Sequence, residues 1–268
     1  PSVRTFYHSG DAGDIVYALL TVKLMGGGKV YLGADPHIKY DVKTRVRLSP
    51  EAFCNLDELV RSQPYVKGCS YADVFPEGAI DVNRNEFRIW LIDHQSGNYW
   101  NNPGYSSTLS LARVHTKVFG IDTVDETEPW LSASPIEVPG RPIVVARSTR
   151  YNNHRFPWKE IASVYASKMF FIGSDDEYEV WKLKAEPRVE VPHIKTKTLA
   201  DVASYIAGSK LFIGNQSCPG AIAEGLKLPL VQESWDHDPN CMFDRPNALY
   251  QSESADDIVA FSSVFLDK

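Results

Sequence analysis

The stretch "KLFIGNQSCPGAIAEGLKLPLVQE" (residues 210–233) decides the fold class. An apolar run at 210–214 predicts a buried strand, and a polar turn follows it. Pro219 then opens a helix over 219–228, because proline fits the first turn of a helix. A second apolar strand, 229–233, comes directly after that helix. Two strands joined by a helix of this length form a parallel β-α-β unit.

The same alternation extends along the chain on both sides of this unit. Further strands are expected at 3–8, 29–33, 66–71, 86–93, 143–147 and 169–174. Further helices are expected at 15–25, 49–63, 105–120, 158–167, 175–185, 198–209 and 255–267. We therefore expect an α/β protein built from parallel sheets.

A proline-rich stretch over 125–142 interrupts the alternation and predicts a linker. We expect two Rossmann-like lobes, 1–135 and 136–268, with the last helix able to pack back on the first lobe. Their parallel sheets would face a central cleft. Ligands of such sheets bind beyond the carboxyl ends of the strands.

Composition excludes several classes of protein. The 268 residues are 43% hydrophobic and 23% charged, which is typical of a globular protein. The net charge of -6 gives no general attraction to nucleic acid or anionic membrane. Four cysteines without a C-x-x-C pair argue against a zinc ribbon or a disulfide framework. With neither a long apolar run nor a signal-peptide pattern, we expect a cytoplasmic protein without a transmembrane segment.

The stretch "HSGDAGDIVYALL" (8–20) places Gly10, Asp11, Gly13 and Asp14 between a predicted strand and a predicted helix. This spacing is neither G-x-G-x-x-G nor a Walker A loop. A carboxylate here suits a general base acting on a hydroxyl, because the helix dipole would keep it ionised. A helix N-cap is the alternative role. Which of the two aspartates would be the base stays open.

The second half carries a candidate anion site. Backbone N–H groups of Ser217, Cys218 and Gly220 open a helix and can hold a diphosphate, although a strand–helix turn needs no ligand. Arg147 ends a buried strand, where its guanidinium is expected to clamp phosphate oxygens, and Ser148 extends the same turn.

Several of these motifs together resemble a known family. "GDAGDIVYALL" (10–20) is similar to the opening motif of the heptosyltransferases, glycosyltransferases of the GT-B fold. The segments 143–162, 171–179 and 199–231 resemble the family's nucleotide-binding lobe in the same order. The middle of the first lobe carries no such likeness, and Asn215 stands uncharged at a position that is acidic in the family.

The resemblance implies a role for each matched residue. Asp14, after Gly13, would be the base, and Glu177, four residues after Gly173, would hold the donor ribose. From spacing alone, Glu177 is more simply an acid in the first turn of a helix. The turn that begins at Asn215 would meet the donor phosphates.

The expected activity is that of an inverting, metal-independent glycosyltransferase. It would use a nucleotide-diphosphate sugar as co-substrate, with no further cofactor, and a saccharide hydroxyl as acceptor. Alternatives are transfer to hydroxymethylated bases of phage DNA, a sugar-nucleotide epimerase, and a non-catalytic nucleotide-binding module. The sugar, the nucleotide and the oligomeric state stay open.

Two further clusters invite assignment. Asp236, His237 and Asp238 could be metal ligands by residue type. Because no partner ligand lies at helical spacing, we interpret 235–240 as a polar loop. The aromatic and amide-rich stretch 94–105 is either a surface loop or a stacking surface for sugars or bases.

Overall fold

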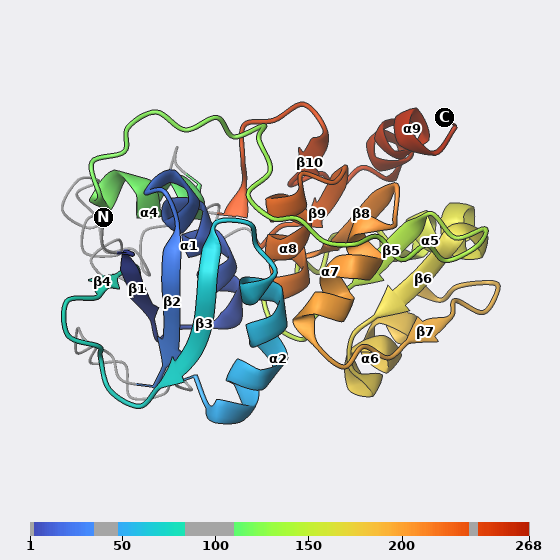
Figure 1. The fold of residues 1–268 in the computed structure, drawn as a ribbon. Coiled ribbons are helices and arrows are strands. Elements are labelled where there is room, and N and C mark those ends of the chain that lie inside the picture. Colours follow the sequence, from blue (N-terminus) through green and yellow to red (C-terminus); the bar gives the residue numbers. More distant parts are fainter. Residues whose placement is uncertain (1–2, 35–47, 84–109, 236–240, 268) are drawn as a thin grey trace. The chain divides into compact units, whose positions relative to one another are not determined.

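The computed structural model describes residues 3–34, 48–83, 110–235 and 241–267 (Figure 1). The chain divides into two compact units, Pro1–Glu126 and Thr127–Lys268. Each unit contains a sheet in which every strand pairing is parallel. The α/β class with two parallel sheets is therefore confirmed, and the boundary falls before the expected position at 135/136.

The first unit has a sheet with strand order β3-β2-β1-β4. Helices α1 and α4 pack against each other, while α2 packs on β2 and β3. The expected strand 86–93 lies outside the described residues. The elements are β1 (Thr5–His8), α1 (Ala12–Leu24), β2 (Gly28–Gly33), α2 (Pro50–Arg61), β3 (Val66–Ala72), β4 (Ile80–Asp81) and α4 (Leu111–Val118).

Local signals set the ends of these helices. Gly26 and Gly27 follow α1 with φ of 88° and 72°, a backbone conformation that glycine adopts without steric cost. Ser49 caps α2, because its Oγ accepts from the Ala52 amide at 3.1 Å and Pro50 occupies the first helical position. The two glycines thus set where α1 ends, and the Ser49 cap sets where α2 begins.

The second unit has a six-stranded sheet with strand order β10-β9-β8-β5-β6-β7. Its elements are β5 (Ile143–Ala146), α5 (Trp158–Tyr165), η1 (Ala166–Lys168), β6 (Met169–Ile172), α6 (Asp175–Ala185), β7 (His193–Ile194), α7 (Leu199–Ala207), β8 (Leu211–Asn215), α8 (Cys218–Leu226), β9 (Leu230–Glu233), β10 (Ala248–Tyr250) and α9 (Ala255–Leu266). Every residue of β5, β6, β8 and β9 is buried, including the polar residues that end β8 and β9, as expected for parallel strands covered on both faces.

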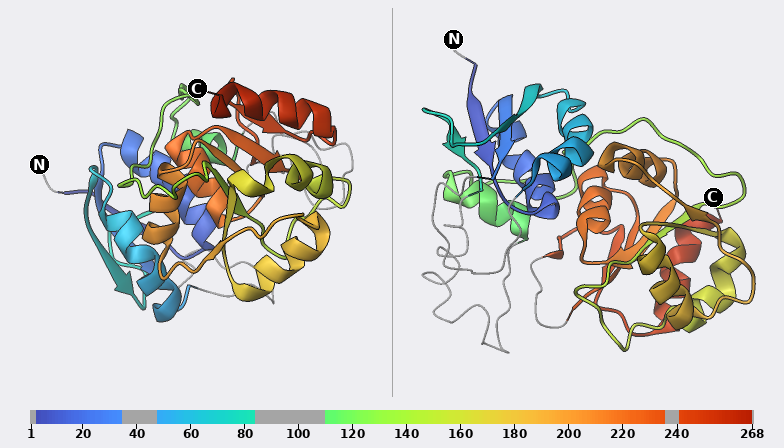
Figure 2. Two further views of the ribbon diagram at one scale, coloured as in Figure 1. Left: turned by 90° about the vertical axis from the view of Figure 1, so that its right-hand side faces the viewer. Right: turned by 90° about the horizontal axis from the view of Figure 1, so that it is seen from below.

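The helices of the second unit form two packed groups (Figure 2). α7 packs against α8, while α5 packs against α6 and α9. The last helix, α9, is fixed to α5 by the Tyr165 hydroxyl, which donates to the Val259 carbonyl at 3.1 Å. Helix α9 thus belongs to the core of the second unit.

The proline-rich segment expected as a linker is largely part of the second unit. The amides of Trp130 and Leu131 both donate to the Gly225 carbonyl, at 3.0 and 2.9 Å. Farther along, the Ile136 amide donates to the Ser204 carbonyl at 2.9 Å. These bonds hold the segment along α8 and α7, which is why the second unit begins near Thr127.

Candidate functional site

The strand order of the second unit reverses between β5 and β8, and the carboxyl ends of these two strands are neighbours. From β5 the chain proceeds to β6 on one side, while β8 lies on the other side of β5. In open parallel sheets, ligands bind at such a reversal of strand order. The loop after β5 and the turn after β8 carry most of the predicted donor-binding residues.

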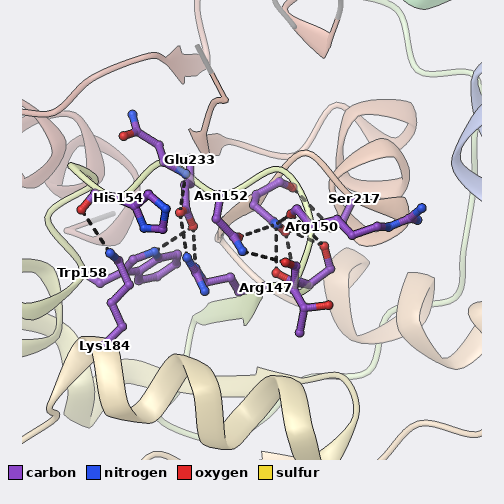
Figure 3. Close-up of polar contacts among 12 residues, drawn as sticks. Arg147, Arg150, Asn152, His154, Trp158, Lys184, Ser217 and Glu233 are labelled. Carbon is purple, nitrogen blue, oxygen red and sulfur yellow. Dashed lines mark hydrogen bonds and ion pairs between the residues drawn. The ribbon is translucent and has the colours of Figure 1, made fainter. Parts of the chain in front are cut away.

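Asn215 joins these two segments. Its buried side chain accepts from the Ser148 amide at 3.0 Å through Oδ1. Its Nδ2 lies 3.2 Å from the Ser148 carbonyl, 2.6 Å from the Arg150 carbonyl and 3.0 Å from the Asn152 Oδ1. The amide therefore braces the loop after β5 from the end of β8 (Figure 3). Acceptors that surround Nδ2 explain why an uncharged amide stands here instead of a carboxylate.

Arg147 has a different partner from the predicted phosphate. Its Nε lies 2.7 Å from Glu233 Oε2, and its Nη2 lies 3.0 Å from Glu233 Oε1. Both side chains are almost fully buried, at 4% and 0% exposure. Glu233 also accepts from the Asn153 amide at 2.9 Å and from Trp158 Nε1 at 2.8 Å (Figure 3). In this structure Arg147 is part of a buried hydrogen-bond network at the carboxyl ends of β5 and β9.

The turn after β8 leads directly into α8, whose first residue is Cys218. Ser217 is the N-cap residue, and its hydroxyl donates to the Asn215 carbonyl at 3.2 Å instead of capping the helix. A Cβ at Gly220 would lie 2.8 Å from the same carbonyl, so the helix start can approach the strand only with glycine here. Ser217 and Cys218 are partly exposed. Amides at the N-terminus of a helix can bind an anion, and those of α8 are the candidates here.

Glu177 is engaged in a capping box at the start of α6. Its Oε2 accepts from the Ser174 amide at 3.0 Å, while the Ser174 hydroxyl accepts from the Glu177 amide at 3.2 Å. Gly173 precedes this box with a φ of 145°, and a Cβ there would lie 2.8 Å from Glu177 Oε2. The structure thus gives Glu177 the local role of an acid in a first helical turn. A carboxylate retains further lone pairs for a second partner.

In the first unit, the Gly-Asp stretch follows β1, in the same way as the loop after β5 follows β5 in the second unit. β2 and β4 flank β1, so strand order also reverses at the carboxyl end of β1. Asp11 is the N-cap of α1, although its side chain makes no capping hydrogen bond. Asp14 lies in the first turn of α1 and is partly exposed. Gly10 lies in the loop before the helix, and Gly13 lies with Asp14 in the first turn of α1.

Two residues that sequence reasoning missed support the Gly-Asp stretch. His8 is buried, and its Nδ1 accepts from the Gly10 amide at 3.0 Å. Burial, together with the charge of His115, lowers the pKa of His8 well below its usual value, so the ring is neutral. Asn83, two residues after β4, donates to the Ser9 hydroxyl at 2.9 Å. A histidine at the end of a predicted strand, directly before the Gly-Asp stretch, could have been recognised in the sequence as a candidate. Asn83 could not, because it comes close to Ser9 only when β4 pairs with β1.

Other predicted features lie partly outside the described residues. Residues 236–240, which contain the metal candidates, and the stretch 94–105 are among these. Within the described ranges, no group of three or more His, Cys, Asp or Glu side chains is arranged to hold a metal ion. In the same ranges, no helix has the length and apolar character needed to cross a membrane.

Comparison with solved structures identifies similar folds. A family 9 glycosyl transferase from Veillonella parvula matches with a TM-score of 0.58 and 12% identity, over 98% of this chain and 89% of that one. The E. coli heptosyltransferase WaaC, solved with ADP-2-deoxy-2-fluoro heptose, matches with a TM-score of 0.54 and 12% identity, over 97% and 99% of the two chains. The expected resemblance to heptosyltransferases is therefore confirmed at the level of fold.

The fold is shared with a second class of enzyme. A structure described as a putative UDP-N-acetylglucosamine 2-epimerase from Listeria monocytogenes matches with a TM-score of 0.51 and 10% identity, over 100% of this chain and 89% of that one. No protein-family model and no curated protein matches this sequence. Fold similarity at these identities does not choose between the two activities.

Proposed function

We propose that this protein is a glycosyltransferase that moves a sugar from a nucleotide-diphosphate sugar to an acceptor hydroxyl. The observation that carries the proposal is the arrangement at the carboxyl ends of β5 and β8 in the second unit. There, Asn215 fixes the loop after β5 beside the amide groups that open α8. This is the arrangement that a leaving diphosphate requires, because fixed N–H donors stabilise its charge without rearrangement.

The donor would bind through residues that follow three neighbouring strands, β8, β5 and β6. The amides of Cys218 and Gly220 and the hydroxyl of Ser217 would contact the diphosphate, and Ser148 would contact it from the loop after β5. Glu177, with Gly173 beside it, would accept from a ribose hydroxyl through lone pairs that the capping box leaves available. Arg147 would act indirectly, by holding the loop after β5 through Glu233.

In the first unit, Asp14 would be the general base. It lies in the first turn of α1, where the positive end of the helix dipole stabilises negative charge. The carboxylate would remove the acceptor hydroxyl's proton while that oxygen attacks the anomeric carbon and the nucleoside diphosphate leaves. A single direct displacement of this kind inverts the anomeric configuration. We propose that the chemistry needs no metal ion and that the acceptor is a saccharide.

A thermal-shift screen tests this proposal directly. The full chain is heated with ADP, UDP, GDP and CDP, and with ADP-glucose, UDP-glucose and GDP-mannose. A ligand at one hundred times its Kd adds about 2.7 kcal/mol to the free energy of unfolding, which raises the melting temperature measurably. If none of these compounds raises it, the donor site proposed here is wrong.

The same proposal must be separated from epimerase activity, which the Listeria structure makes relevant. The nucleotide sugar that stabilises the protein is incubated with it in the absence of an acceptor. A transferase leaves the sugar configuration of the donor unchanged under these conditions. Conversion of the donor to its epimer or to free epimerised sugar, followed by NMR, would support the epimerase instead.

A further inference from the structure

A pair of aromatic side chains lies at the carboxyl edge of the second unit's sheet. Tyr151 belongs to the loop after β5, and Trp235 follows β9 two residues after its end. Their ring centroids are 5.5 Å apart, with an angle of 55° between the ring planes. Both residues are partly exposed. None of the roles proposed above uses this pair.

The backbone of Trp235 is fixed to the start of α8. Its amide donates to Oε1 of Gln216 at 2.7 Å. Gln216 is itself buried and immediately precedes Ser217, the N-cap of α8. The tryptophan is therefore attached one residue away from the proposed diphosphate site.

Tyr151 is held on both sides by Asn215. The asparagine Nδ2 donates to the carbonyl of Arg150 and to the side chain of Asn152, the two residues that flank the tyrosine. Between them, Tyr151 has a φ of 54°, which is uncommon for a bulky residue and persists only where the surroundings impose it. The Arg150 guanidinium lies 5.7 Å from the centre of the tyrosine ring. The brace that forms the anion site thus also sets the position of this ring.

Strand order indicates which part of the donor would meet the pair. The strands run β9-β8-β5-β6 across the sheet. The ribose partner Glu177 follows β6, the diphosphate site follows β8, and Trp235 follows β9. A donor whose ribose is at β6 and whose diphosphate is at β8 therefore directs its sugar toward β9. Neighbouring strands are about 4.8 Å apart, so β6 and β9 are separated by about 14 Å.

We propose that Tyr151 and Trp235 form the face on which the donor's sugar ring packs. The substrate class is a nucleotide-diphosphate sugar in pyranose form, whose C–H face is apolar and whose hydroxyls are polar. Tyr and Trp match this character, because each has a large apolar ring surface and a polar group at its edge. Arg150 adds donors for sugar hydroxyls beside the tyrosine. This inference rests on the proposed function, since it assumes a diphosphate bound at α8.

The experiment measures two affinities for each variant of the full chain by isothermal titration calorimetry. The probes are ADP, UDP and GDP and the matched sugars ADP-glucose, UDP-glucose and GDP-mannose, and the best-bound pair is used. Trp235→Leu and Tyr151→Asn remove one ring each, and asparagine is chosen because it tolerates a positive φ. We expect the nucleotide sugar to bind about tenfold more weakly, the scale of one stacking contact, and the free diphosphate to stay within twofold.

Two controls accompany these variants. Trp235→Phe keeps an aromatic surface and should retain nucleotide-sugar affinity within about threefold. Tyr31→Leu removes a partly exposed aromatic ring from β2 of the first unit and should leave both affinities unchanged. Melting temperatures establish that each variant is folded.

Three results would overturn the inference, and they differ from one another. Equal weakening of diphosphate and nucleotide sugar would mean that the rings contact the nucleotide portion, with the proposed function intact. Unchanged affinities in both ring variants would mean that the pair does not touch the donor. Absence of any nucleotide binding by the wild-type chain would remove the proposed function, and the inference with it.

Discussion

Arg147 and Glu233 form a buried two-point ion pair that passes over the end of strand β8. Arg147 follows β5 and Glu233 ends β9, and β8 lies between these two strands in the sheet. Trp158 and the Asn153 amide complete the hydrogen bonding of the carboxylate. The Glu233 carboxylate therefore connects the end of β9 with the segment 147–158, which lies 75 to 86 residues earlier in the sequence.

Removing the arginine should strongly destabilise the second unit. Arg147→Met leaves the Glu233 carboxylate buried without its cation, which costs about 3–5 kcal/mol. Urea unfolding of the full chain, followed by tryptophan fluorescence, measures the loss. The double variant Arg147→Met/Glu233→Gln should recover part of it. Lys159→Met, which breaks an exposed ion pair with Glu186, should cost about 1 kcal/mol or less and serves as control.

Asn215→Asp should be harmful even though it restores the acid that the heptosyltransferase motif has at this position. A carboxylate cannot donate to the Ser148 and Arg150 carbonyls, and its buried charge would be uncompensated. We expect a loss of about 3 kcal/mol or more in unfolding free energy and weaker nucleotide binding. Asn152→Ala removes one of the acceptors around Nδ2 and should cost about 1 kcal/mol. Unchanged stability of Asn215→Asp would show that the amide is not the brace described here.

The buried His8 predicts a pH dependence of stability. Its pKa is lowered in the folded protein, so the unfolded chain takes up a proton below about pH 6.5 while the native ring stays neutral. Its contribution is complete above pH 6.5, and it is lost as the pH falls below that value, by up to about 1.4 kcal/mol per unit. His8→Asn keeps an acceptor for the Gly10 amide without titrating. Between pH 5 and 6.5 this variant should show a flatter dependence of unfolding free energy than the wild type. The exposed His154→Asn should keep the wild-type slope.

Asp14→Asn should separate chemistry from donor binding. Loss of a general base lowers transfer by about 10²–10⁴-fold, whereas the donor site in the second unit is untouched. Single-turnover assays give the transfer rate, and calorimetry gives the donor affinity. Asp11→Asn is the matched variant, at the N-cap three residues before Asp14, and should reduce transfer only slightly. A larger loss in Asp11→Asn than in Asp14→Asn would reassign the base to Asp11.

Glu177→Gln should separate capping from ribose binding. Glutamine can complete a capping box, so the melting temperature should change little. A neutral amide binds a ribose hydroxyl less strongly than a carboxylate does, so the affinity for the best-bound nucleoside diphosphate should fall several-fold. The 2′-deoxy form of that nucleotide lacks one ribose hydroxyl, so its affinities for the variant and for the wild type should differ less. Equal affinities of variant and wild type for the ribonucleotide would leave Glu177 as a helix cap only.

The sequence predicted the elements whose signals are local. Caps such as Ser49 and Thr198 mark helix starts because a side-chain oxygen bonds an amide three residues later. The short strands β4, β7 and β10 were missed, since two or three residues carry no periodic pattern and are defined by their neighbours in the sheet. Helix and strand identity thus follows from nearby residues, but the edges of a sheet do not.

The structure brings several of the predicted donor-site residues together, and their contacts follow only partly from the sequence. Asn215, Ser217 and Ser148 lie together because strand order places β5 beside β8. The partner of Arg147 could not be predicted, because Glu233 is 86 residues away and comes within reach only once β9 takes its place in the sheet. An arginine at the end of a strand indicates a nearby anion, and the sequence alone did not show whether that anion was a ligand or a side chain.

The attachment of Trp130, Leu131 and Ile136 to α8 and α7 changes how the connection between the two units should be regarded. A flexible tether can gain or lose residues with little penalty. Here an added residue between 130 and 136 would move each later amide away from its carbonyl on the second unit. Changes in the length of the chain between the units should therefore be accommodated before Trp130, and not among the prolines that follow it.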